Sequence, residues 1–131
     1  MDALRPLRPH VLVVDNYHDA AVSLARLLER WGFQPAVAFD GSSALALASA
    51  DPPAAVLLEV GLPGLDGYEL AARLRELPGM GQALLVALIG YGQKEDVRRC
   101  SAAGIDLHLL KPCDPEELRR VLDRMAARPT P

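Results

Sequence analysis

The chain has 131 residues, of which 50% are hydrophobic and 24% are charged, and its formal net charge is −3. These values fit one globular domain that buries a core without help from a metal ion or disulfides. They exclude a strongly basic nucleic-acid-binding domain, and no apolar run approaches the ~20 residues of a membrane-spanning helix.

Short apolar runs alternate with amphipathic segments along the whole chain. The apolar runs are too short for helices, which favours buried strands, and the segments between them carry apolar residues at helical spacing. The predicted strands are 11–14, 34–39, 55–58, 84–88 and 107–110. Two of the predicted helical segments are 42–50 and 93–103. The other three are recognised by their apolar faces: Ala21, Leu24, Leu28 and Trp31; Leu70, Leu74 and Leu77; and Leu118, Val121, Leu122 and Met125. Five β-α units of this length predict a parallel sheet covered by helices on both faces.

Capping and turn residues fix several of these boundaries. We expect Asp19 to cap the first helix and Gly32 to end it. Pro35 near the start of the second strand indicates a sheet edge. The run Asp-Pro-Glu-Glu at 114–117 is typical of a helix start, with a cap, a proline at the first helical position and a glutamate at the third.

The domain organisation is expected to be simple. One domain covers residues 9–127, after an N-terminal extension at 1–8 and before a short tail at 128–131, with no linker. Cys100 and Cys113 have neither metal-ligand spacing nor a disulfide framework around them, so we interpret both as reduced packing residues. Because the N-terminus lacks a signal-peptide pattern, we expect a cytoplasmic protein.

Three of the predicted strands end in polar groups. Asp15 and Asn16 follow the first strand, Glu59 ends the third, and Lys111 follows the fifth. In open parallel sheets, ligands bind at the carboxyl ends of the strands. The sequence therefore predicts one shared site at this edge of the sheet.

Four motifs at these strand ends carry a family resemblance. They are Val-Leu-Val-Val-Asp-Asn, Leu-Pro-Gly-Leu-Asp-Gly-Tyr-Glu-Leu, Ala-Leu-Ile-Gly-Tyr-Gly-Gln and Leu-Leu-Lys-Pro. In order and spacing the chain resembles a response-regulator receiver domain of two-component signalling over residues 9 to 127. The resemblance implies a flavodoxin-like (βα)5 fold with strand order 2-1-3-4-5. The residues at 90–93 and after Lys111 are most similar to receivers joined to hybrid sensor kinases.

The resemblance also implies a phosphorylation site. Glu59 occupies the phosphoacceptor position, which receives a phosphoryl group from a histidine kinase. A magnesium ion would be held by Asp15, Asn16, Glu59 and the backbone carbonyl of Gly61, and Lys111 would bond the phosphoryl group. Such a site works by positioning and charge neutralisation.

The switch that reports phosphorylation is implied at other positions. Ile89 stands where a Ser or Thr hydroxyl is usual, His108 stands at the aromatic rotamer position, and Pro112 follows the matching Lys111. A receiver of this kind is a signalling module and no enzyme. It meets a histidine kinase, an output protein or a second receiver through its fourth helix, fifth strand and fifth helix, here about residues 93–125.

Three residues depart from the family pattern, and each departure weakens the expected phosphorylation site. Asn16 removes one metal-binding charge, and Glu59 moves the acceptor carboxylate by roughly an ångström, which can cost on the order of 100-fold in a positioned reaction. Ile89 cannot donate a hydrogen bond, and a charged oxygen left short of one loses about 1.5–3 kcal/mol. We interpret the chain as a degenerate receiver that acts by protein interaction, with magnesium bound weakly or not at all.

The longer side chain of Glu59 could also form a permanent ion pair with Lys111. Such a pair would imitate part of a phosphorylated site, so an activated mimic and an inactive scaffold both remain open. The alternative within the family is a working magnesium-dependent phospho-receiver. The residues also have plainer interpretations, in which Lys111 and Glu59 face solvent, Asp15 caps a helix, and His18 is exposed and binds no metal.

Two other classes of function are disfavoured. A hydrolase or phosphatase would need a Gly-x-Ser-x-Gly elbow or an Asp-x-Asp after the first strand, and neither occurs. A nucleotide or flavin binder would need a glycine-rich phosphate loop there, whereas Asp-Asn-Tyr-His has the wrong charge. No direct contact with nucleic acid or membrane is expected.

Overall fold

The computed structural model describes residues 8–62, 64–90 and 97–128. In these ranges five parallel strands form one sheet in the order β2-β1-β3-β4-β5. The strands are β1 His10–Val14, β2 Gln34–Ala38, β3 Ala55–Glu59, β4 Leu84–Ile89 and β5 Leu107–Leu110. The helices are α1 His18–Arg30, α2 Gly41–Ala50, α3 Gly67–Glu76, α4 Val97–Ala103 and α5 Pro115–Ala127.

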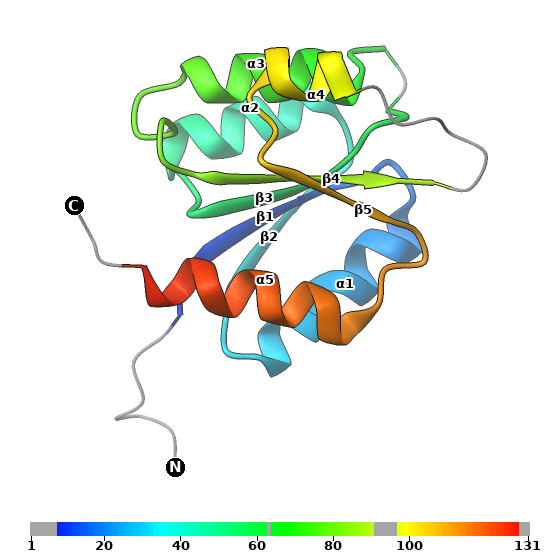
Figure 1. Cartoon of the computed structure of the whole chain (residues 1–131), viewed down its shortest axis with the longest axis vertical. Helices are drawn as coiled ribbons and strands as arrows, with labels where there is room; N and C mark the ends of the chain where they lie inside the picture. Colours follow the sequence, from blue (N-terminus) through cyan, green and yellow to red (C-terminus); the bar gives the residue numbers. More distant parts are fainter. Residues whose placement is uncertain (1–7, 63, 91–96, 129–131) are drawn as a thin grey trace.

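The helices cover the sheet on both faces, as predicted. Figure 1 shows α1 and α5 on one face and α2, α3 and α4 on the other. The predicted doubly wound fold and its strand order are confirmed, and β2 lies at an edge, as Pro35 indicated.

Alternation along the strands builds two cores. Leu12 and Val14 of β1 pack toward α2 and α3, while Val11 and Val13 pack toward α1 and α5. The central strands β1 and β3 are buried on both sides, which explains their continuous hydrophobic runs. The two cysteines belong to different cores. Cys100 is buried in the core under α2 and α3, and Cys113 packs against the core under α1 and α5. Neither thiol forms a disulfide.

One predicted cap was wrong. The N-cap of α1 is Tyr17, whose side chain makes no capping bond, and Asp19 lies in the first turn of the helix. The helix begins at His18, two residues earlier than a cap at Asp19 allows. The Asp19 carboxylate is therefore placed to interact with the helix dipole. The other signals hold: Gly32, with a φ of 90°, follows the helix, and Asp114 caps α5 by accepting a bond from the Glu116 N–H.

The predicted helix at 93–103 is only partly described. Its residues 97–103 form α4, whereas 93–96 lie outside the described residues. Within the described ranges, no helix is both long enough and apolar enough to cross a membrane.

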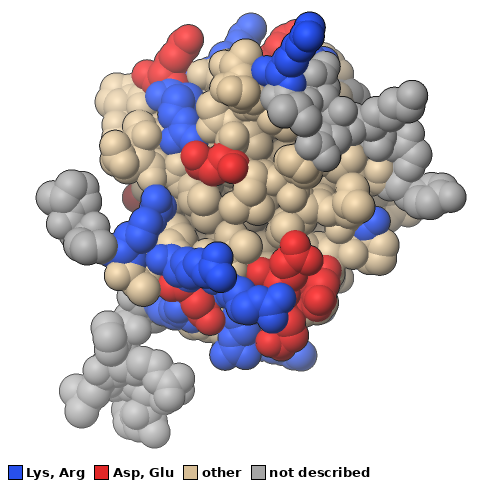
Figure 2. Space-filling view, in the orientation of Figure 1, with Lys and Arg blue, Asp and Glu red and all other residues tan. Residues whose placement is uncertain are grey.

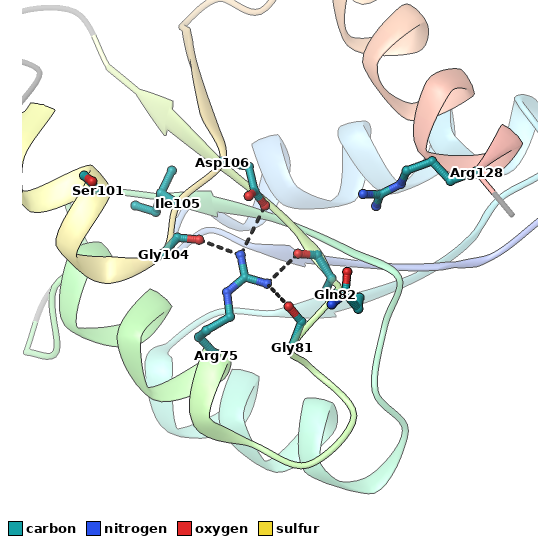
Figure 3. A pocket seen from close by; sticks show the side chains of 9 residues that line it. Arg75, Gly81, Gln82, Ser101, Gly104, Ile105, Asp106 and Arg128 are labelled. Atoms are coloured by element: carbon teal, nitrogen blue, oxygen red, sulfur yellow. Dashed lines mark hydrogen bonds and ion pairs between the residues drawn. The ribbon is translucent and has the colours of Figure 1, made fainter. Parts of the chain in front are cut away.

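Arg75 joins three segments at the end of the sheet opposite the predicted site. Its guanidinium donates five hydrogen bonds of 2.5 to 3.3 Å. Figure 3 shows it among the acceptors at Gly81, Gly104 and Asp106, beside a pocket of about 370 Å³. The acceptors are the carbonyl oxygens of Met80, Gly81, Ala83 and Gly104 and a carboxylate oxygen of Asp106. One side chain thus ties α3 to the turn before β4 and to the turn after α4.

Replacing Arg75 with alanine should destabilise the domain by about 2 kcal/mol, because partly buried carbonyls lose a charged donor. Urea denaturation measures this loss. Arg73→Ala is the matched control, since Arg73 lies two positions earlier on the same helix and is exposed. The control should stay within about 0.5 kcal/mol of the parent. Equal losses in the two variants would contradict a bridging role for Arg75.

Candidate functional site

The carboxyl ends of β1, β3 and β5 bring three of the predicted residues together. The Lys111 ammonium donates a hydrogen bond of 2.9 Å to Asp15 Oδ2. It also donates to Glu59 Oε2 and forms ion pairs with both carboxylates. The ion pair between Glu59 and Lys111, which the longer glutamate made conceivable, is therefore present in the structure. We call these three residues the ion triad.

The ion triad is largely withdrawn from water. Asp15 is 4% exposed, and the side chains of Glu59 and Lys111 are 13% and 28% exposed. Burial alone would lower the pKa of Lys111, but its bonds to Glu59 and Asp15 outweigh this effect and raise the pKa above the ordinary lysine value. Lys111 is therefore a permanent cation at any physiological pH.

Backbone bonds hold the ion triad in place. The second carboxylate oxygen of Asp15 accepts the Tyr17 N–H at 2.9 Å. The Lys111 N–H donates to the Ile89 carbonyl at 2.8 Å, which extends the pairing of β5 with β4 by one residue. Asp15 is thereby fixed at both oxygens, and Lys111 is fixed at its backbone.

Gly67, the first residue of α3, is a structural part of the site. A Cβ added at Gly67 would lie 2.7 Å from the Glu59 carbonyl oxygen and 2.6 Å from Val60 Cα. The Gly67 N–H also donates to the Val60 carbonyl at 3.0 Å. The start of α3 therefore packs directly on the backbone that carries Glu59. The only sequence signal was a glycine at the first helical position, where a residue with a side chain is usual.

The remaining predicted residues do not join the ion triad. Ile89 is fully buried, while Asn16, Gly61 and Pro112 are exposed and His108 is partly exposed. The Lys111–Pro112 peptide bond is cis. His108 lies on the edge strand β5, paired in register with Ala87 of β4. The structure thus places a hydrocarbon at the position of the expected hydroxyl.

The donor set does not fit a divalent metal in this arrangement. The two carboxylates that would bind a magnesium ion, Asp15 and Glu59, both already accept from the Lys111 ammonium. Asn16 contributes an exposed amide with no charge. In the described part of the chain, no three His, Cys, Asp or Glu side chains gather as a metal cluster. Magnesium prefers an octahedral set of oxygens, whereas Lys111 supplies the cation that these oxygens bind here.

His18, a minor candidate for metal capture, has other contacts. Its ring stacks on Phe39 with centroids 5.0 Å apart, and its Nδ1 lies 3.7 Å from the Asp19 carboxylate. The His18 side chain is 72% exposed. The ring is therefore part of an exposed aromatic contact at the rim of the sheet.

Helix α4 is tied to α3 at both of its ends. Near its start, Arg99 donates to the Asp66 carboxylate at 2.7 Å and lies 4.4 Å over the Tyr68 ring. After its end, Arg75 holds the Gly104 carbonyl. Burial alone would raise the pKa of Asp66, but the Glu69 N–H and the Arg99 guanidinium together lower it below its ordinary value. Asp66 is therefore charged at neutral pH and able to hold Arg99.

Comparison with known proteins gives consistent matches. The response regulator receiver domain family matches residues 11–123. The virulence sensor protein BvgS of Bordetella bronchiseptica is 36% identical over 129 residues, and the match covers 92% of this chain and 10% of that protein. An uncharacterized 14.6 kDa protein of Leptolyngbya boryana is 35% identical over 87% of both chains. The chain therefore spans about a tenth of BvgS and most of the Leptolyngbya protein.

A solved structure agrees with these matches. It is the receiver domain of a sensor histidine kinase from Pseudomonas aeruginosa, crystallised with a magnesium ion in its active-site cleft. This domain is 26% identical, has a TM-score of 0.82, and the match covers 92% of this chain and 99% of that chain.

Proposed function

Because this chain belongs to the response regulator receiver family, we propose that it is a degenerate receiver that acts as a protein-interaction module without being phosphorylated. Receiver domains are modules of two-component signalling. The domain would still take part in two-component signalling, but phosphorylation would not control its conformation.

The ion triad is the observation that carries the proposal. The Lys111 ammonium is already bonded to both carboxylates on which acceptance of a phosphoryl group would depend. A phosphoryl transfer to Glu59 would first have to separate that carboxylate from its cation. The extra methylene of Glu59 also misplaces the nucleophile by roughly an ångström, a displacement that costs on the order of 100-fold.

The side chain of Ile89 and the contacts of helix α4 favour one fixed conformation over a change of conformation on phosphorylation. Ile89 has no hydroxyl with which to report a phosphoryl group, and its side chain is fully buried in the core. Arg99 and Arg75 tie α4 to α3 at its two ends. A movement of α4 would break these bonds without a new one at position 89 to offset them. These contacts favour the scaffold over an activated mimic.

The proposal requires no magnesium. Asp15 and Glu59 are neutralised in part by Lys111, so bringing a dication to the same oxygens would set it against the ammonium. We therefore expect magnesium to bind weakly or not at all and to leave the folding stability unchanged.

We propose that the face made by α4, β5 and α5 binds the partner. Its described part runs from Val97 to Met125. The partner would be a histidine kinase or an output protein in the cytoplasm. Such a partner is needed because the receiver fold by itself defines no output. The edge strand β5 lies in this face and presents Leu110 to solvent with 69% of its surface exposed.

Incubation with acetyl phosphate and magnesium, followed by an intact-mass measurement, tests the proposal. We expect the mass of the unmodified chain, because Glu59 is paired and misplaced. A stoichiometric phosphoryl adduct on Glu59 would favour the alternative, a working magnesium-dependent phospho-receiver.

A further inference from the structure

A hollow of about 510 Å³ lies at the end of the sheet opposite the ion triad. It is lined by the segments that lead into β1, β3 and β4 and by the last turn of α5. Of its described lining residues, only Met125 falls within residues 97–125, the described part of the α4, β5 and α5 face. The hollow is therefore distinct from that face and from the candidate site.

The floor of the hollow is apolar and consists mainly of proline and alanine. Pro53, Ala83 and Met125 are buried there, and Ala54 and Ala126 are partly buried. Proline and alanine side chains lose almost no rotamer entropy when they are covered. A ligand that covers this floor therefore gains apolar contact at little cost in ordering the protein.

Arg128 supplies the charge of the hollow. It is exposed, and no described lining residue is acidic. Within the described ranges, its guanidinium forms no hydrogen bond or ion pair. Figure 3 shows its side chain reaching from the end of α5 toward the pocket of Arg75, with no dashed line to the other residues drawn. Arg128 is therefore a cation without a counter-charge beside an apolar floor.

Two acidic groups near the hollow already have partners. Asp106 pairs with Arg75 at 3.1 Å, and Asp123 of α5 pairs with Arg8 at 2.7 Å. Figure 2 shows Lys and Arg side chains in a row over α5, with acidic side chains gathered beside one end of the row. The exposed acidic residues at the start of α5, far from the hollow, are Asp114, Glu116 and Glu117. The unpaired charge at the last turn of α5 is therefore positive.

We propose that this hollow binds an extended segment of a partner protein in which an acidic residue stands between two apolar residues. The acidic side chain accepts hydrogen bonds from Arg128, since a guanidinium and a carboxylate can form two parallel bonds. The apolar side chains cover the floor at Ala54, Ala83 and Ala126. The inference goes beyond the proposed function, because it assigns a second surface and does not depend on the state of Glu59.

Gln82 favours a peptide segment over a small organic acid. Its side chain is exposed, lines the hollow, and forms no hydrogen bond within the described ranges. A carboxamide both donates and accepts, as the peptide group of a ligand requires. Gln82, Ala83 and Arg128 also line the adjoining pocket of Arg75, so the surface continues beyond the reach of a single side chain. An extended segment can follow this surface, whereas a small acid covers only part of it.

A chemical-shift titration of the isotope-labelled chain with the peptide N-acetyl-Leu-Glu-Leu-amide tests the proposal. The shifts should concentrate on the backbone amides of Ala54, Gln82, Ala83 and Ala126, which line the hollow. N-acetyl-Leu-Gln-Leu-amide should bind at least about tenfold more weakly, because it cannot form the charged pair with Arg128. N-acetyl-Gly-Glu-Gly-amide should also bind at least about tenfold more weakly, because it leaves the apolar floor uncovered.

Arg128→Glu should lose binding of the glutamate peptide and gain binding of N-acetyl-Leu-Lys-Leu-amide, because it reverses the charge beside the floor. Arg120→Glu is the matched control, since it makes the same charge change at an exposed position of the same helix that does not line the hollow. The control should bind the glutamate peptide within about twofold of the parent chain, because exposed charges at a distance are screened. Circular dichroism should show both variants folded.

Several results would overturn the inference. They are an absence of shifts at millimolar peptide, shifts that fall outside the hollow, and equal binding of the glutamate, glutamine and glycine peptides. An Arg128→Glu variant that binds the glutamate peptide as tightly as the Arg120→Glu control would also overturn it. Octanoate that shifts the same amides as strongly as the peptide would assign the hollow to small amphiphilic acids and contradict a peptide ligand.

Discussion

Lys111→Met should lose about 2–4 kcal/mol of folding free energy at pH 7. Removal of one partner from a buried ion pair costs about 3–5 kcal/mol. Lys111 is 28% exposed, which reduces the loss somewhat. The variant keeps Asp15 and Glu59 side by side, both largely buried and without a cation. Urea denaturation measures the loss.

The pH dependence of this variant gives a second test. Because the pKa of Lys111 is raised by its carboxylate partners, its contribution is complete below the ordinary lysine value of about 10.4. It is lost as the pH rises through the higher pKa of the folded protein. The gap between parent and variant should therefore stay constant from neutral pH to about pH 9 and close in stronger alkali.

Arg73→Met is the control for Lys111→Met, because it removes one positive charge from an exposed side chain. It should stay within about 0.5 kcal/mol of the parent. A Lys111→Met variant as stable as this control would mean that the two carboxylates are solvated and that the ion triad contributes nothing.

Gly67→Ala should destabilise the domain by about 2–4 kcal/mol, because a methyl group at this position meets backbone atoms that have no room to move. The contacts would be 2.6 Å to Val60 Cα and 2.7 Å to the Glu59 carbonyl oxygen. Relief of the clash requires α3 to shift away from β3, which also disturbs Glu59. Thermal and urea denaturation should both show the loss.

Gly81→Ala provides the matched control. A Cβ at Gly81 meets nothing within 4 Å, and Gly81 is not among the glycines with a positive φ. Its replacement should be neutral or stabilise the chain by up to about 1 kcal/mol, since it reduces the entropy of the unfolded state. Similar losses at Gly67 and Gly81 would show that the close approach of α3 to Glu59 is unimportant.

The periodicity of the sequence predicted the sheet because strand burial is a local pattern. Val11 to Val14 form a continuous apolar run that only a strand buried on both faces accommodates, and β1 is such a strand. The strand ends then placed Asp15, Glu59 and Lys111 at one edge. The ion pair of Glu59 with Lys111 followed from the reach of the glutamate side chain, and the structure contains it. The second pair, between Lys111 and Asp15, was not predicted.

Contacts between distant segments lay beyond the sequence pattern. The clamp of Arg75 depends on the turn at Gly104, 29 residues away, and nothing in the helix periodicity distinguishes Arg75 from Arg73. The role of Gly67 likewise depends on how closely α3 approaches β3. The cap at Asp19 was wrong for a related reason: Asp15 accepts a bond from the Tyr17 N–H directly after β1, and the helix begins at the next residue, His18.

We propose that the ion triad and Ile89 prevent phosphorylation of this chain. The direct measurement compares the parent chain with a variant restored to the family pattern by Asn16→Asp, Glu59→Asp and Ile89→Thr. Both are incubated with acetyl phosphate and magnesium, and the mass of each intact chain is then measured by mass spectrometry. We predict an unmodified parent chain and a restored variant that gains one phosphoryl group. A parent chain that gains the group as completely as the variant would contradict the account.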